Sequence, residues 1–365
     1  MGFEPCIQIV DTPNILETLM PIGFQAYKPK FNRTDIAPSM STSKIRLSVL
    51  EARALCLQVL ARQAVRPDYA KVITDHVIDA ALCGYEYSGL PKLLQLIHNP
   101  KWKNKTTPIE VTYETVMSKV IDGGNHSGMI VLQEATNQLI GMAQKNGMAL
   151  VGVNNTWMSG RSAYYVEEIA RHKLVGIHTV GASDLVAPFG GGKPSLGTNP
   201  IAFGFPMKDE PLVIDLSTAA FPGTELDFYA LLNRELPSGV ALDLHGEPTT
   251  DPLKAKKGAL LPFGGHKGYA LALGLQALAV LAGSHRSPNH DYGYFFIAFK
   301  PDLLMPLPEY ENALLALLEK VKNTPTRKGV ESIRIPGQKG QALRAFHQTN
   351  GIEVDPDIYS QLQAL

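Results

Sequence analysis

The segment CGYEYSGLPKLL, residues 83–94, combines hydroxyl side chains with a cation at Lys92. Hydroxyl groups and ammonium groups can move a proton or bind a carboxylate. The segment contains no histidine, which is the usual proton donor near neutral pH. Ser88 alone cannot replace a histidine, because the pKa of a serine hydroxyl is far too high. The open question is which group moves the proton, if the chain does chemistry at all.

The segment FGGHKGY, residues 263–269, surrounds His266 and Lys267 with three glycines directly before a long apolar stretch. Backbone N–H groups at a helix start, together with a lysine, can bind a phosphate or a carboxylate. The alternative is a surface turn that caps a core helix, and the residues alone do not decide between the two. The uniformly apolar residues 269–283 that follow predict a helix buried in the core.

Two further polar residues could take part in chemistry. Asp215, in PLVIDLST, ends a strand that reads as buried, so its carboxylate is either paired structurally or orients a polar ligand or a histidine. His126, in GGNHSG, could bind an anion or transfer a proton, although a lone loop histidine usually does neither. His172 and His178 are expected to be surface or packing residues. No pair of histidines and acids has the i, i+4 spacing of a metal site, so no metal is expected.

The usual dinucleotide fingerprint, GxGxxG after a strand, is absent from the chain. GGGKPSLGT, residues 190–198, is not followed by a helical pattern and lacks the ending of a phosphate loop, so it is interpreted as a tight glycine turn between two strands. Helical and strand patterns alternate along the chain, which favours an α/β or α+β fold. Helices are predicted at 43–65 (capped by Ser43), 67–84, 127–147, 162–173 and 308–324, and strands within 109–125, at 148–155, 174–181, 211–217 and 293–299, with a glycine-rich loop at 187–206.

The bulk composition excludes several classes of function. The 365 residues carry a formal net charge of zero, so there is no electrostatic footprint for nucleic acid. No apolar run reaches the roughly 18–20 residues of a membrane helix, and no signal peptide is recognised, so a cytoplasmic protein is expected. Residues 1–43 are interpreted as an extension. Cys6, Cys56 and Cys83 are scattered, which predicts neither disulfides nor structural zinc.

Several motifs, taken in order, resemble one family. IDGGNHSG at 121–128, LGTNP at 196–200, PTTDP at 248–252 and LPFGGHKG at 261–268 are jointly similar to the malate/L-lactate dehydrogenase family, which has a non-Rossmann cofactor fold. The family includes L-sulfolactate, ureidoglycolate and diketogulonate dehydrogenases and Δ1-piperideine-2-carboxylate reductases. The resemblance implies reversible hydride transfer between NADH or NADPH and a C=O or C=N carbon beside a carboxylate, in a small-molecule substrate.

The fold that the resemblance implies is a mixed-sheet α/β subunit like that of L-sulfolactate dehydrogenase, in a homodimer. Its division would be a helical substrate and dimerisation domain at 44–118 plus 305–365, and a cofactor domain at 119–304. The implied cofactor-lining residues are Val180, Gly181, Ala182, Ser183, Asp184, Leu185, Val186, Gly265, His266, Lys267 and Gly268, with Pro336 and Gly337 closing over the cofactor. Either Arg161 or Lys193 could meet a 2′-phosphate, or be a solvated surface cation.

The chain departs from the family pattern at the opening segment. That pattern is roughly arginine-glycine, two residues, Ser-His-Gly, two residues and arginine. Here Ser88 stands at the histidine, Tyr87 at the serine before it, and Lys92 at the carboxylate-binding arginine, so the charge remains but the bidentate fork is lost. A second family histidine is also missing, with Thr156 or Met158 in its place as the predicted substrate contact.

Three hypotheses follow, with Ser88, Tyr87, Lys92, Asp215 and His126 as the candidate catalytic residues. In the first, the substrate is an imine beside a carboxylate, which arrives protonated and needs no acid at the hydride step. In the second, a 2-oxo or 2-hydroxy acid is the substrate and Tyr87 is a substitute acid, its pKa lowered toward neutrality beside Lys92. Tyr85 and His126 are further candidates for this donor. In the third, the chain is a pseudoenzyme that binds NAD(P) without turnover.

Overall fold

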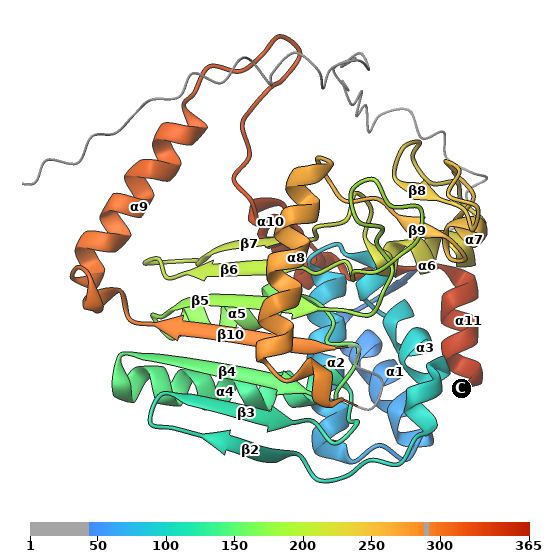
Figure 1. Ribbon diagram of the computed structural model, residues 1–365, viewed down its shortest axis with the longest axis horizontal. Coiled ribbons are helices and arrows are strands. Elements are labelled where there is room, and N and C mark those ends of the chain that lie inside the picture. The colour runs from blue at the N-terminus through green and yellow to red at the C-terminus, as the bar shows by residue number, and fades with distance from the viewer. Residues whose placement is uncertain (1–43, 288–291) are drawn as a thin grey trace, which may run out of the picture. The chain divides into compact units, whose positions relative to one another are not determined.

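A mixed sheet of seven strands lies at the centre of the chain, of which this computed structural model describes residues 44–287 and 292–365 (Figure 1). The strand order is β2-β3-β4-β10-β5-β6-β7; β3 pairs with β4 in parallel, and the other neighbours pair antiparallel. The strands are β2 (Glu110–Glu114), β3 (Ser118–Asp122), β4 (Met148–Asn154), β5 (Val175–Gly181), β6 (Ile201–Phe205), β7 (Leu212–Leu216) and β10 (Gly293–Phe299). This arrangement confirms the predicted mixed-sheet α/β fold.

Helices cover both faces of this sheet. α4 (Gly128–Asn146) and α5 (Ser162–Arg171) pack on one face, and α8 (His266–Leu281) crosses the other (Figure 1). α4 follows its predicted course, because the Ser127 hydroxyl accepts the Met129 N–H at its start and Gly147 ends it with a φ of 88°. A positive φ favours glycine, so the chain can turn directly into β4 at this position.

A second layer is helical and has a hydrophobic cluster of its own. It consists of α1 (Val49–Arg62), α2 (Pro67–Leu82), α3 (Pro91–His98), α10 (Gln338–Asn350), α11 (Pro356–Ala364) and the two-stranded ribbon of β1 (Ile45–Leu47) with β11 (Ile352–Val354). Apolar residues recur at helical spacing in α1 and α2, and Leu60, Ile73 and Val77 are fully buried. α2 also packs against α4, so it joins the helical layer to the sheet.

The remaining elements are short, apart from one helix. They are the 3₁₀ turns η2 (Glu86–Ser88), η3 (Pro100–Lys103), η4 (Ser284–Arg286) and η5 (Pro301–Leu303), with α6 (Gly223–Leu231), α7 (Pro252–Ala255), β8 (Ala241–Leu242) and β9 (Ala259–Leu260). The exception is α9 (Leu307–Lys322), which lies beside the sheet with none of its residues buried (Figure 1).

Two predicted elements are wrong in this structure. The helix predicted at 43–65 begins only at Val49, capped by the Ser48 hydroxyl, because residues 45–47 pair with β11 as a strand. The predicted cap Ser43 lies outside the described residues, as does the extension 1–43. Residues 201–205, predicted as loop, form β6 between β5 and β7. Gly204 permits this packing, since a Cβ there would lie 2.0 Å from the Val166 carbonyl oxygen of α5.

The prediction of a buried core helix at 269–283 is right for only one side of α8. Leu275 and Ala279 are buried, whereas Leu281 is 69% exposed. Beyond His266 and Lys267, which are exposed on the first turn, the exposed side carries only apolar and small residues, which we call the α8 stripe: Ala270, Leu273, Gly274, Ala277, Val280 and Leu281. The sequence pattern was misleading here, because a helix that is apolar all round reads as core.

The pairing of the strands brings several loops to one edge of the sheet. The C-terminal ends of β3, β4, β5 and β7 and the N-terminal ends of β6 and β10 meet there. Most of the predicted site residues lie on the loops that leave this edge. All the described residues belong to one compact unit, and its division into 44–118 plus 305–365 and 119–304 stays a prediction. None of the described helices is long and apolar enough to cross a membrane.

Candidate active site

The predicted catalytic segment forms a tight turn between α2 and α3. Gly84, with a φ of 77°, redirects the chain after α2, and η2 then carries Tyr87 and Ser88. Ser88 is buried, with only 7% of its surface exposed. η2 contacts α2, α3 and α6, so the turn is held between the helical layer and the segment that follows β7.

Lys92, on the first turn of α3, is enclosed by neutral groups. Its Nζ donates to Gln95 Oε1 at 3.1 Å and to Thr224 Oγ1 of α6 at 3.2 Å, and the residue is 5% exposed. Burial lowers the pKa of Lys92 to about 8, and the charge of Asp227 opposes this shift only in part. The ammonium group therefore keeps no ion-pair partner among the described residues and is bound to α6.

Tyr87 is not activated as predicted. Burial raises the pKa of its hydroxyl, and the charges of Glu225, Tyr85 and Asp215 raise it further, while Arg161 alone lowers it. Lys92, the cation expected to lower this pKa, directs its ammonium group to Gln95 and Thr224 instead. The predicted fall of the Tyr87 pKa toward neutrality is therefore wrong, and the hydroxyl stays protonated at neutral pH.

Asp215 lies at the end of β7, and its Oδ2 accepts the Ala163 N–H at the start of α5, 2.8 Å away. By surface area the residue is exposed, yet protein atoms crowd around its carboxylate. That crowding raises the pKa of Asp215, against the opposing effects of the Ala163 N–H and the Arg161 charge. Its other oxygen, Oδ1, accepts no hydrogen bond from the described residues.

Arg161 is not a solvated surface cation, which is one of the two alternatives that the sequence left open, and its contact with a 2′-phosphate stays a prediction. Its side chain is 11% exposed, and Nη1 pairs with Asp79 at 2.7 Å. The guanidinium also lies over the ring of Tyr85, 4.5 Å from the centroid. Its backbone N–H donates to Nε2 of buried His76 at 2.8 Å. Gly160 permits this contact, because its φ is 75° and a Cβ would lie 2.1 Å from His76 Nε2.

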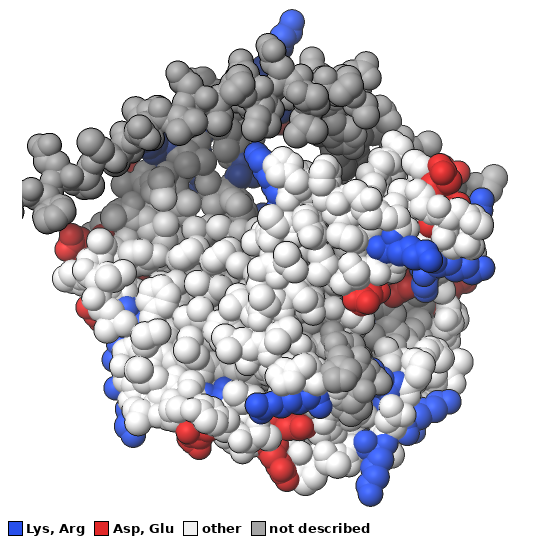
Figure 2. Space-filling model, viewed as in Figure 1, with Lys and Arg blue, Asp and Glu red and all other residues white. Residues whose placement is uncertain are grey.

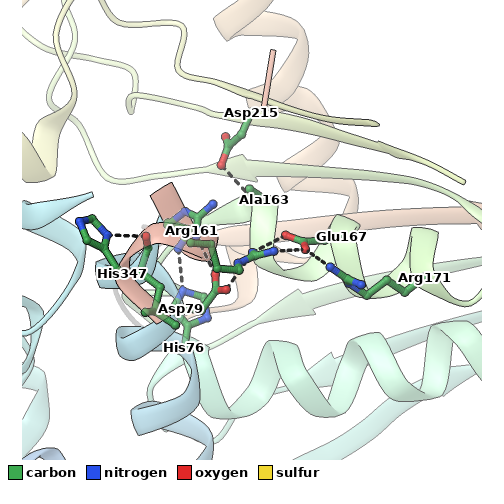
Figure 3. Close-up of polar contacts among 10 residues, drawn as sticks. His76, Asp79, Arg161, Ala163, Glu167, Arg171, Asp215 and His347 are labelled. Carbon is green, nitrogen blue, oxygen red and sulfur yellow. Dashed lines mark hydrogen bonds and ion pairs between the residues drawn. The ribbon is translucent and has the colours of Figure 1, made fainter. Parts of the chain in front are cut away.

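A network of ion pairs is connected to Arg161 through Asp79 (Figure 3). Arg344 of α10 forms an ion pair with Asp79 at 2.8 Å and donates to both oxygens of Glu167 at 2.6 and 2.7 Å. Arg171 pairs with Glu167 in turn at 2.8 Å. The network joins α2, α5 and α10, and so fixes the positions from which Arg161 and Asp215 project. Desolvated, fork-shaped pairs of this kind hold geometry better than surface pairs do.

His126, Thr156 and Met158 lie apart from this group. His126 contacts the Tyr69 ring at 5.4 Å and the Thr107 carbonyl at 3.0 Å. Tyr69 is at the start of α2, about 20 Å from its C-terminal end at 1.5 Å per residue, whereas Tyr87 follows that end. The Thr156 hydroxyl donates to the His126 carbonyl at 2.6 Å, and Met158 packs on the hydrophobic cluster of the helical layer. Their catalytic and substrate-binding roles stay predictions.

The predicted cofactor segments lie on loops at the sheet edge. The Ala182 N–H donates to Asn199 Oδ1 at 2.9 Å, and Phe263, just before the GGHKG turn, donates its N–H to the Thr218 carbonyl after β7. The side chains of Val180 and Val186 are buried in hydrophobic clusters, so only their backbone can face a ligand. In the segment after β5, Gly181 ends the strand, Ser183 and Asp184 are exposed, and Leu185 is partly buried. At the start of α8, His266 and Lys267 are exposed, and Gly265 and Gly268 flank them. Pro336 and Gly337 lie along β7 near Val213.

Arg161, Asp79 and His76 were missed as parts of the site. One signal was available for Arg161, because it follows the NNTWMSG segment directly and precedes a helix. No local signal marks Asp79 or His76, since both lie on the buried side of an ordinary amphipathic helix. Among residues 44–287 and 292–365, no group of three or more His, Cys, Asp or Glu side chains is placed to hold a metal ion.

Comparison with known proteins agrees with this fold. The chain superimposes on the sulfolactate dehydrogenase structure from Methanocaldococcus jannaschii with a TM-score of 0.76 and 30% identity, covering 88% of this chain and 96% of that one. It is 30% identical to malate/(S)-sulfolactate dehydrogenase of Methanothermus fervidus, over 87% of this chain and 96% of that protein. It is 32% identical to Δ(1)-pyrroline-2-carboxylate reductase 1 of Burkholderia ambifaria, over 90% of this chain and 99% of that protein.

The fold is thus that of sulfolactate dehydrogenase and related reductases, an oxidoreductase class without a Rossmann domain. Residues 47–363 match the malate/L-lactate dehydrogenase family, and the chain belongs to that family. The family consists of pyridine-nucleotide-dependent dehydrogenases and reductases that act on substrates bearing a carboxylate. The resemblance noted in the sequence is thereby confirmed.

Proposed function

We propose that this protein is an NAD(P)H-dependent reductase whose substrate is a cyclic imine with a carboxylate on the C=N carbon. The observation that carries the proposal is that burial raises the pKa of Tyr87, so its hydroxyl stays protonated, in a turn where the sequence predicts Ser88 at the family's histidine. The carboxylate of Asp215 on β7 acts on this hydroxyl electrostatically. A protonated imine brings its own proton, so the hydride step requires no acid. The 32% identity to a Δ(1)-pyrroline-2-carboxylate reductase supports this choice.

The chemistry of the imine fits the charges at the site. The hydride forms a new C–H bond, the C=N π electrons move to nitrogen, and the product is a neutral amine. Asp215 can stabilise the iminium cation, because its carboxylate is crowded by protein and Oδ1 has no hydrogen-bond donor in the described part of the chain. A 2-oxo acid has no such cation for Asp215 to stabilise.

The turn before α8 fits the diphosphate of a nicotinamide dinucleotide, which supplies the hydride when bound. Gly264 and Gly265 have positive φ values of 58° and 63°, and a Cβ on Gly264 would meet nothing within 4 Å. Lys267 is exposed on the first turn of α8. A helix N-terminus with an adjacent cation and an open glycine surface is suited to phosphate oxygens. Either NADH or NADPH fits this turn, with Arg161 and exposed Lys193 as the candidates for a 2′-phosphate.

The proposal includes a homodimer in the cytoplasm. The α8 stripe leaves Leu273 50% and Leu281 69% exposed, and exposed apolar faces of this kind mark protein interfaces. Figure 2 views the face that α8 crosses, where charged side chains are sparse and gather at the rim. An interface with an uncharged centre and a polar rim matches a second copy of the chain.

One observation favours a second function, the reduction of a 2-oxo acid. Lys92, with its pKa lowered to about 8, titrates closer to neutrality than Tyr87 and could supply the proton that an alkoxide needs. Against this, its ammonium group is 5% exposed and bound to Gln95 and Thr224. A third possibility, NAD(P) binding without turnover, is disfavoured by the intact network behind Arg161, which a scaffold does not need.

The test is oxidation of NADPH and of NADH, followed by absorbance, with a panel of substrates. The panel contains Δ1-pyrroline-2-carboxylate, Δ1-piperideine-2-carboxylate, pyruvate, oxaloacetate and sulfopyruvate. Turnover of the cyclic imines above the 2-oxo acids is expected. Turnover of the 2-oxo acids alone would replace the proposal with the second function. Cofactor binding by fluorescence without turnover of any of these substrates would establish the third.

A further inference from the structure

Two opposite charges lie next to each other at the site without forming an ion pair. Arg161 and Asp215 are linked through one loop, because Asp215 Oδ2 accepts the N–H of Ala163, two residues after Arg161 (Figure 3). Each charge acts on the other electrostatically. Their charged atoms nevertheless do not meet, since the guanidinium pairs with Asp79 on α2. Two opposite charges that lie near each other without pairing can each bind the opposite charge of a ligand.

Both charges keep hydrogen-bonding capacity for a ligand. Arg161 uses Nη1 for Asp79, and within the described residues Nε and Nη2 donate to nothing. Asp215 uses Oδ2 for Ala163, and Oδ1 stays without a donor from the same part of the chain. The Tyr85 ring holds the plane of the guanidinium, and the His76 contact holds its backbone. Arg161 is therefore oriented before any ligand binds.

Lys92, which stands at the family's carboxylate-binding position, is less suited to that role. Two of its three ammonium hydrogens already bond to Gln95 and Thr224, and it presents a point charge rather than a fork. Arg161 offers two adjacent donors, the geometry that binds both oxygens of a carboxylate. Binding energy for a carboxylate is thus available at Arg161 rather than at Lys92.

We propose that Arg161 and Asp215 form a two-sided site for a small zwitterion, in which Arg161 binds the carboxylate and Asp215 the cationic nitrogen two bonds away. This rests on the proposed function and gives it a specific selection rule: the ligand carries both charges on one small ring. A 2-oxo acid satisfies Arg161 alone, and a simple imine satisfies Asp215 alone. The site therefore selects 2-carboxylated cyclic imines and their amine products.

The test uses binding of small compounds to the full chain, measured by calorimetry with NADPH or NADH present and absent, because a reduced cofactor cannot oxidise L-proline. L-Proline carries both charges, cyclopentanecarboxylate only the anion, and pyrrolidine only the cation. The wild-type protein should bind L-proline on the order of 10–100-fold more tightly than either of the others. Arg161→Gln should abolish the preference over pyrrolidine, and Asp215→Asn the preference over cyclopentanecarboxylate, each through a loss on the order of 10–100-fold in affinity for L-proline.

Controls separate this site from loss of fold and from failure of the proposed function. Arg161→Gln should fold, because Asp79 keeps its pair with Arg344 at 2.8 Å. Arg66→Gln is the matched control, since Arg66 pairs with Asp68 at 2.6 Å on the surface, and it should leave binding unchanged. Lys92→Gln should leave the preference for a carboxylate in place.

The outcomes are distinguishable. Turnover of cyclic imines by the wild-type protein, together with an Arg161→Gln variant that keeps its affinity for L-proline, overturns the two-sided site but not the proposed function. Loss of the carboxylate preference in Lys92→Gln assigns the carboxylate to Lys92 instead, and also overturns it. Equal binding of all three compounds by the folded wild-type protein refutes the selection rule, and absence of turnover on the earlier panel refutes the function.

Discussion

His178 offers a test of how burial acts on this fold, independent of function. It lies on β5, fully buried, with its ring stacked on Phe296 at 4.1 Å and edge-on to Tyr165 at 5.5 Å. Neither ring nitrogen has a hydrogen-bond partner within the described residues. An unpaired polar group in a core costs about 1–3 kcal/mol. We expect His178→Phe to raise the free energy of unfolding by about 1–2 kcal/mol at pH 7, after some overpacking.

The gain should grow in acid, and the sign follows from linkage. Burial lowers the pKa of His178 from its ordinary value of 6.5 to about 3. Between these values the unfolded chain binds a proton that the folded chain does not, so stability falls as the pH drops below 6.5. The loss between pH 7 and pH 5 amounts to about 2 kcal/mol for one such histidine. His178→Phe removes this loss, so its advantage over the wild-type protein should reach about 3–4 kcal/mol at pH 5.

Urea unfolding at pH 7.0, 6.0 and 5.0, followed by circular dichroism, measures this prediction. His172→Gln, at an exposed position on the end of α5, is the control and should shift neither midpoint nor pH dependence. His178→Leu is a smaller replacement that separates overpacking from the loss of polarity. A gain for both His178 variants that does not change between pH 7 and pH 5 would refute the titration argument. Destabilisation by both would refute the claim that the imidazole is unsatisfied.

Three further changes test the site and the assembly. Lys92→Met should stabilise the protein by about 1–2 kcal/mol at pH 7, because it removes a buried charge. This gain should shrink as the pH rises from about 8 to 10.5, because the wild-type lysine then becomes neutral in both the folded and the unfolded state. Thermal unfolding across that pH range measures the effect. Asp215→Asn should lower kcat/KM for a cyclic imine on the order of 100-fold while NADPH binding, followed by fluorescence, is retained; unchanged turnover would contradict the role of Asp215. Leu273→Glu should convert a dimer to monomers in sedimentation, because it places a charge in the α8 stripe, whereas Leu50→Glu, on the exposed side of α1, should leave the mass unchanged.

The parts of the fold that were predictable from the sequence are those fixed by local chemistry. α4 follows from a serine cap, an apolar stripe and a glycine stop, all within residues 127–147. β1 and β6 were not predictable in this way, since their partners lie far away in the chain: β1 pairs with β11, some 300 residues later. Residues 45–47 carry a pattern that also suits a helix, and only the remote pairing decides. Gly204 in β6 likewise favours a loop by sequence alone, because the reason for a glycine in this strand is the close packing of α5 against it.

The same contrast between local sequence signals and contacts of distant residues applies to the candidate site. Tyr87, Ser88, Lys92 and Asp215 were predicted as site residues because each lies in a short contiguous motif, and their roles stay predictions. Their protonation states were not predictable from the sequence, because the pKa of Tyr87 depends on burial and on groups from three other elements. Arg161 was recognised as a cation but assigned to solvent or to a phosphate, since its partner Asp79 lies on a different helix, 82 residues earlier.

The sequence predicts that Ser88 replaces the family's histidine, and a site without that histidine must obtain the proton from its substrate. A site whose hydroxyl groups stay protonated, with Lys92 enclosed by α6, has no efficient donor for an alkoxide. The same site remains suited to the reduction of an iminium ion, because that ion already holds the proton and needs only a nearby anion to stabilise it. In the proposed function Asp215 supplies this anion, and the crowding by protein atoms that raises its pKa also strengthens its attraction for a cation that replaces solvent. The departure at Ser88 therefore argues for a change of substrate charge more strongly than for a loss of catalysis.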